Sequence, residues 1–189
     1  MTDILLEGVR ETIGWTHAKS PKNEGFLFNQ GLENQSQSTD SISGLIETAP
    51  VEYGIRGASG IAHRIGESCF RSFIRNYGKQ YLLTENSFRL MNSQSRILFG
   101  LEKLAEFADK NCGAQIRIYE DEKFWYWKVL ATSETFNINP LYIPYTFGLL
   151  REFFSWTSGG RFYPMEESSN SRTPGILFQI AINKQPLGN

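Results

Sequence analysis

The sequence predicts an α+β domain in which helices pack on an antiparallel sheet. Three observations carry this prediction. Apolar side chains recur at helical spacing over 57–77 and 95–112, a strand–turn–strand pattern covers 114–132, and a helix followed by two strands covers 141–183. The chain has 189 residues and no internal repeat, which suits one domain with its own core.

The N-terminal part combines a short helix with a polar arm. Residues 3–14 carry apolar side chains near one helical face. From 19 to 44 the chain is rich in Ser, Gln, Asn and Gly, which predicts a loop or a partly disordered arm. An isolated Phe-Leu-Phe triplet in this arm leaves open a second interpretation, a docking segment that orders on a partner. We expect a single domain over 1–189, with its core over about 50–187.

Two helices form the first part of the predicted core. Helix 57–77 ends at Gly78, and helix 95–112 ends at Gly113, as expected for glycine after a helix terminus. The apolar positions that follow the helical period in the first of them are Ala58, Ile61, Ala62, Ile65, Cys69, Phe73 and Tyr77.

A hairpin is expected next, with strands at 114–119 and 124–132 joined by a charged turn. Trp125 and Trp127 share one face of the second strand, because successive side chains alternate between faces.

A helix over 141–157, closed by Gly159 and Gly160, leads to strands at about 161–167 and 175–183. In the last strand Ile176, Phe178, Ile180 and Ile182 are expected to face the core.

Bulk composition excludes several classes of function. The net charge is −1, from 19 basic and 20 acidic residues, which argues against broad electrostatic binding of nucleic acid. Two cysteines are too few for a disulfide scaffold, so Cys69 and Cys112 are expected as buried free thiols. The N-terminus lacks the pattern of a signal peptide, and no apolar run reaches the length of a membrane span. These features predict a cytoplasmic protein.

Candidate functional residues cluster on helix 57–77. His63 is either a structural or exposed histidine or a functional one, which would serve as an axial ligand to a tetrapyrrole metal or as a hydrogen-bond donor to a carboxylate. Arg64 lies beside it and belongs to a basic set that forms either a solvated face or a site for anionic groups. No nucleophile–base set, phosphate loop or zinc spacing is evident, so an enzyme is disfavoured and no metal site is expected.

Aromatic side chains are dense between 124 and 156. Most belong to the core, and some are candidates for lining a pocket for a large apolar ligand. With His63 and Arg64, we name four further candidate ligand-binding residues: Cys69, Phe73, Tyr145 and Phe153.

Three segments resemble a known family. RGASGIAHRIGESCF, GLLREFFSWTSGGRFYPMEES and PGILFQIAINKQPL, within residues 50–187, resemble the vinyl-reductase domain, also called the hydrocarbon-binding domain. That family is similar in fold to subunits of the TRAPP vesicle-tethering complex. The resemblance implies an α+β fold with a buried hydrophobic pocket. Many members bind zinc through cysteines in the last third, but this chain has no cysteine there, so the zinc site is expected to be absent.

The resemblance yields three functional hypotheses. The first is a carrier for a large hydrophobic ligand, such as a chlorophyll-type tetrapyrrole, in pigment handling or photosystem assembly, peripheral to a photosynthetic membrane. The second is an interaction module without a small ligand, acting as a homodimer or on a membrane protein of the photosynthetic apparatus. The third, a pigment vinyl reductase, lacks any fingerprint for a hydride-donating cofactor.

Overall fold

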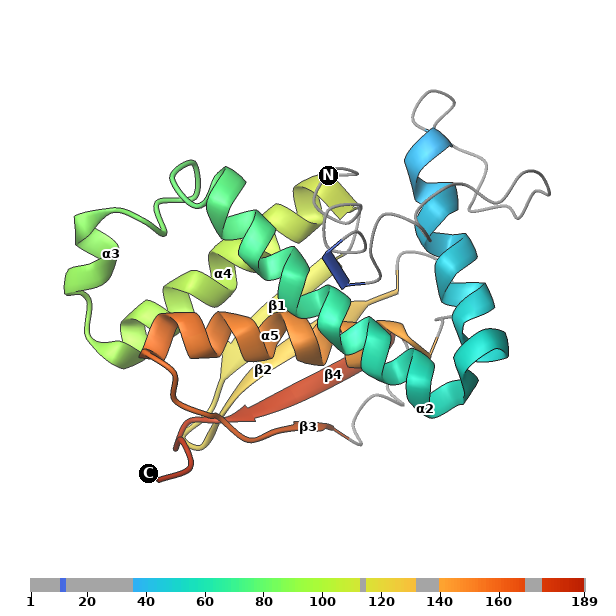
Figure 1. Cartoon of the computed structure of the whole chain (residues 1–189). Helices are drawn as coiled ribbons and strands as arrows, with labels where there is room; N and C mark the ends of the chain where they lie inside the picture. Colours follow the sequence, from blue (N-terminus) through green and yellow to red (C-terminus); the bar gives the residue numbers. More distant parts are fainter. Residues whose placement is uncertain (1–10, 13–35, 113–114, 132–139, 169–174, 189) are drawn as a thin grey trace. The chain divides into compact units, whose positions relative to one another are not determined.

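The computed structural model describes residues 11–12, 36–112, 115–131, 140–168 and 175–188 (Figure 1). The chain divides into two compact units, which we describe separately. The first unit comprises 1–72 and 139–149, and the second comprises 73–138 and 150–189.

Unit 2 contains a four-stranded antiparallel sheet with the order β1-β2-β4-β3. Its strands are β1 (Gln115–Glu120), β2 (Phe124–Leu130), β3 (Met165–Glu167) and β4 (Ile176–Asn183). The register places Ile118 of β1 opposite Trp127 of β2, which lies opposite Ile180 of β4. These three side chains therefore share one face of the sheet.

That face forms the core of unit 2. Trp125 and Trp127 are almost fully buried, as are Ile180 and Ile182. The second half of helix α5 (Tyr142–Ser158) packs on this face, with the Phe154 ring centroid 5.8 Å from that of Trp125. Helix α4 (Ser93–Cys112) contacts β1, and the Asp109 carboxylate accepts a hydrogen bond from the Ile116 amide. Alternating apolar residues on the strands thus meet the apolar stripes of two helices.

The opposite face of β4 is also buried at its centre. Gln179 is 1% exposed, although the sequence alternation assigns it to the outer face. Its side-chain oxygen accepts a hydrogen bond of 2.6 Å from the Tyr119 hydroxyl, which reaches across β2. The Tyr119 ring stacks on Tyr126, with 4.5 Å between the centroids. Aromatic side chains on the two neighbouring strands therefore help to cover this face.

Asp121 closes the β1–β2 hairpin and changes the titration of a nearby tyrosine. Its carboxylate accepts backbone hydrogen bonds from Lys123 and Phe124, and a hydrogen bond of 2.7 Å from the Tyr126 hydroxyl. The bond to Asp121 raises the pKa of Tyr126 to about 12, because losing the phenol proton would bring two negative oxygens together.

We expect Asp121→Asn to return the Tyr126 pKa towards its reference value of 10.0. Because the folded-state pKa is the higher one, this interaction stabilises the fold fully below about pH 10 and is lost as the pH rises towards 12. NMR titration of tyrosine-labelled protein would measure the change. Equal Tyr126 pKa values in the wild type and the variant would contradict the assignment.

Helix α2 (Ser36–Tyr77) is longer than the sequence pattern predicts. It contains a kink at Gly54, where φ is 69° and only glycine is free of strain. The predicted core helix at 57–77 is therefore the part after the kink. The predicted arm over 19–44 is wrong from Ser36 onwards, where the backbone is helical, and its earlier part lies outside the described residues.

The other predicted elements can now be compared with the structure. The α+β class with an antiparallel sheet is confirmed, as are the helices near 95–112 and 141–157 and the hairpin strands. The strand expected at 161–167 is reduced to the three residues of β3 at the sheet edge. The short helix α3 (Asn86–Leu90) has no counterpart among the predicted elements. Of the predicted N-terminal helix, only residues 11 and 12 are described, and both are helical.

Candidate functional site

His63 and Glu67 form a partly exposed pair on α2 in unit 1. The Nδ1 atom of His63 lies 3.4 Å from Oε1 of Glu67, one helical turn later. The side chains are 28% and 24% exposed, so both are accessible at the surface without being fully solvated. A carboxylate beside one ring nitrogen favours a proton on that nitrogen. The arrangement is therefore that of an oriented imidazole.

A close crossing of α2 with the first half of α5 fixes the backbone at this pair. A methyl group on Gly148 would overlap the carbonyl oxygen of His63 and lie 2.7 Å from its carbonyl carbon. A methyl group on Gly66 would overlap the carbonyl oxygen of Tyr145 and lie 2.7 Å from the Leu149 nitrogen. The two glycines thus allow backbone-to-backbone contact, so this crossing leaves no space between the helices for a ligand.

A small apolar cluster lies on the same two segments. Ala58, Ala62 and Leu141 are buried together, and Tyr145 packs against them while remaining half-buried. The small alanines permit this close packing. It accounts for the burial of Ala58 and Ala62 on α2.

The six predicted ligand-binding residues are divided between the two units. His63, Arg64, Cys69 and Tyr145 belong to unit 1, whereas Phe73 and Phe153 belong to unit 2. Arg64 is exposed beside the histidine. Cys69 is 1% exposed, and Phe73 and Phe153 are core residues. Only His63, Arg64 and Tyr145 are thus accessible at all, and their role in ligand binding stays a prediction.

The basic set on α2 faces outwards. Arg64, Arg71 and Arg75 are all exposed, and Arg71 donates a hydrogen bond to the Ser68 hydroxyl. No group of three His, Cys, Asp or Glu side chains within the described ranges could hold a metal ion. Within those ranges, too, no helix is long and apolar enough to cross a membrane.

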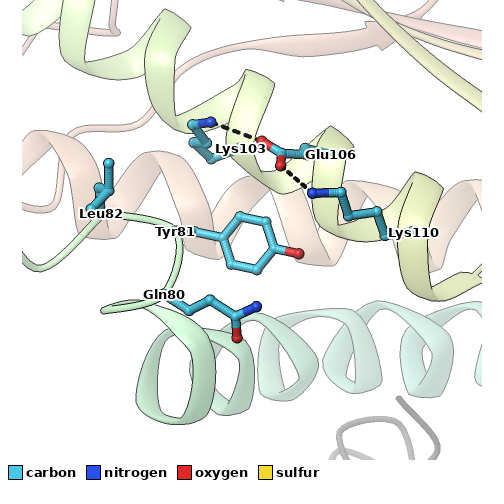
Figure 2. Close-up of a pocket in the computed structure, with 6 residues that line it drawn as sticks. All are labelled: Gln80, Tyr81, Leu82, Lys103, Glu106 and Lys110. Carbon is cyan, nitrogen blue, oxygen red and sulfur yellow. Dashed lines mark hydrogen bonds and ion pairs between the residues drawn. The ribbon is translucent and has the colours of Figure 1, made fainter.

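Unit 2 carries a hollow that the sequence analysis missed. Its volume is about 110 Å³, and it lies between α4 and the loop that follows α2 (Figure 2). It is lined by Gln80, Tyr81, Leu82, Lys103, Glu106 and Lys110. Helical spacing of the three α4 residues could have predicted their ion pairs. The position of Tyr81 opposite them could not have been predicted, because it depends on the path of the loop.

Charge in this hollow is organised around Glu106. Its carboxylate accepts hydrogen bonds of 2.8 Å from Lys103 and 2.6 Å from Lys110. These two bonds lower the pKa of Glu106 below its ordinary value, and the bond to Glu106 raises the pKa of Lys110. Glu106 and Lys110 therefore stay charged around neutral pH.

Solved structures with a similar fold are H-NOX domains. An oxygen-binding H-NOX domain related to soluble guanylate cyclases matches with a TM-score of 0.55 and 11% identity, over 99% of this chain and 95% of that one. A mutant of the T. tengcongensis H-NOX matches with a TM-score of 0.57 and 10% identity, over 99% and 97%. The IWP-051-bound H-NOX from Shewanella woodyi, in its Fe(II)CO state, matches with a TM-score of 0.52 and 13% identity, over 100% and 96%.

These likenesses establish the fold, which is that of H-NOX domains, and at such low identity they establish nothing further. No family model and no curated protein sequence matches this chain.

The predicted resemblance to vinyl-reductase and TRAPP-type domains is therefore wrong, because the similar structures are H-NOX domains. The pigment-reduction and photosynthetic roles were inferred from that resemblance and are therefore wrong as well. The quoted segments consist of helix, glycine turn and strand, an order that many α+β domains share. Apolar periodicity in such segments reports burial and does not distinguish one family from another.

Proposed function

We propose that this chain is a small-ligand-binding domain that would hold heme, with His63 as the protein ligand to the iron. The observation that carries the proposal is the His63–Glu67 pair. Metal-bound histidines usually donate their second ring nitrogen to a carboxylate or carbonyl, as Nδ1 of His63 is placed to do with Glu67. The H-NOX fold supports the choice of ligand, since one of the similar structures concerns heme redox potential and another a Fe(II)CO state.

His63 is the residue that we assign to the heme iron. Heme iron accepts His, Cys, Met or Tyr as protein ligands. Of the two histidines in the chain, His63 lies in the described part, and its side chain is accessible. Cys69 is too buried to serve without rearrangement. The backbone contacts at Gly66 and Gly148 leave no space for a ligand between α2 and the first half of α5. A planar group would therefore approach His63 from its exposed side.

Each side chain has a distinct role in this proposal. Glu67 would hold the proton on Nδ1, and Nε2 would be the ring atom that binds the metal. Exposed Arg64 is available to pair with a carboxylate of the ligand. The close contact of Gly148 with the His63 carbonyl fixes the helix backbone that carries the imidazole. When bound, heme would supply an iron centre able to take up a diatomic gas.

Hemin titration followed by absorption spectroscopy tests the proposal. The wild type is expected to saturate at one heme per chain, whereas His63→Ala should lose saturable binding and regain it on addition of imidazole. Glu67→Gln should weaken heme binding by about 10- to 100-fold. The matched control is His17→Ala, which removes the other histidine and should titrate like the wild type. Identical titrations of His63→Ala and wild type would contradict the proposal.

A second candidate function is an interaction module without a small ligand. The closed core of unit 2 favours it, because Phe73, Phe153, Trp125 and Trp127 are all nearly or fully buried. In this core Phe153 packs edge-on against Phe154, with 5.2 Å between the centroids. A protein that stays free of heme but forms a homodimer in sedimentation experiments would favour this candidate.

A further inference from the structure

We propose that the hollow between α4 and the 78–83 loop binds a small anion through its phosphate or carboxylate group. The ligand would contact the ammonium groups of Lys103 and Lys110, with Tyr81 forming the opposite wall. This inference uses unit 2 alone and is independent of heme binding at His63.

The charge of the hollow selects an anion. Two lysines and one glutamate leave a net charge of +1 in its lining. Each ammonium group has three N–H donors and gives one to Glu106. In the described part of the chain no other hydrogen-bond acceptor takes the remaining donors. Glu106 therefore holds both lysines in place while leaving N–H groups for an additional acceptor.

The opposite wall is rigid and partly aromatic. The Tyr81 ring packs against the rings of Phe73 and Phe107, with 5.7 Å between the centroids in each pair. Backbone hydrogen bonds from Leu83 to Gly78 and from Gly78 to Ile74 close the loop. Figure 2 shows the Tyr81 ring between Gln80 and the three α4 side chains, with Leu82 to one side. A wall that is formed in advance reduces the ordering required when a ligand binds.

Leu82 provides a second, independent observation. Its φ is 62°, and it is the one non-glycine residue with positive φ within the described ranges. A branched side chain in this region is strained, and such strain is concentrated at functional sites. Leu82 is also 51% exposed, so burial of its side chain does not explain the conformation. The strained backbone instead sets the direction of the chain beside Tyr81.

The size of the hollow limits the ligand. The hollow has a volume of about 110 Å³ and is open to solvent, so it can take a group of the size of inorganic phosphate or a short carboxylate. The probes are therefore inorganic phosphate and acetate.

Two-dimensional NMR of the isotope-labelled full chain tests this inference. Phosphate, acetate and chloride are titrated at constant ionic strength, and the amide shifts of residues 80–82 and 103–110 are followed. We expect saturable shifts at these amides with phosphate, acetate or both, and none with chloride. Response to one anion alone would identify which group the hollow prefers.

Variants assign the shifts to the two lysines. Lys103→Gln combined with Lys110→Gln should weaken binding by about tenfold or more. The control is Lys123→Gln, which removes one exposed positive charge in the β1–β2 turn and should leave the titration unchanged. Spectra of the variants without anion establish that they are folded. Absence of saturable shifts in the wild type, or equal shifts in the double variant, would overturn the inference.

Discussion

Gly148→Ala is expected to destabilise the protein by about 3 kcal/mol or more, measured as the free energy of unfolding in urea. The added methyl group would overlap the carbonyl oxygen of His63. The obstacle is backbone in the middle of helix α2, which cannot rotate away as a side chain would. The two helices must therefore separate or bend, with loss of the packing around Ala58 and Ala62.

Gly60→Ala is the matched control on α2. No atom lies within 4 Å of a methyl group at this exposed helical position. Alanine has the higher helix propensity, so this substitution should stabilise the protein by up to about 1 kcal/mol. The two Gly→Ala changes are thus predicted to have opposite signs. Destabilisation of similar size at both positions would contradict the close helix crossing.

The second large effect is expected for Phe153→Ala, with a loss of about 3–5 kcal/mol in the free energy of unfolding. Phe153 is 0% exposed and lies edge-on to Phe154. Its ring also fills the space over Gly100, where a methyl group would lie 2.7 Å from Cε2. Removing the ring leaves a cavity that the closely packed side chains around Phe153 cannot fill.

Phe162→Ala is the control for this measurement, because the Phe162 side chain is 47% exposed. Its expected cost is below about 1 kcal/mol. The comparison also bears on the predicted ligand-binding role of Phe153. A ring that packs the ligand-free core must contribute strongly to stability without any ligand. A small loss on removing it would instead indicate a ring that lines an open pocket.

Periodic elements could be predicted from sequence because burial imposes their pattern directly. Helix α4 and strands β1, β2 and β4 have regular apolar spacing, and each lies within a few residues of its expected range. The first part of α2 could not be predicted, since a stretch rich in Ser, Gln and Asn has the composition of a loop. The burial of Gln179 was missed for a different reason, because Tyr119 from another strand reaches it.

Of the two candidate sites, too, one could be predicted from sequence and the other could not. His63 could be proposed from sequence because histidines are rare in this chain, and its pairing with Glu67 follows from helical spacing. The hollow between α4 and the 78–83 loop could not be predicted. It depends on the left-handed backbone of Leu82, and a leucine in the sequence does not indicate such a conformation. The H-NOX fold could not be predicted from sequence either, since 10–13% identity leaves no motif to compare.

The most direct test of the account is the absorption spectrum and heme content of the protein purified from heme-replete cells, with His63→Ala prepared in parallel. The account predicts one heme per chain in the wild type, with the Soret band of a histidine-ligated iron. It predicts a loss of that band in His63→Ala while the far-ultraviolet circular dichroism is unchanged. A folded wild-type protein that is colourless and free of heme, and that stays so when hemin is added, would contradict it.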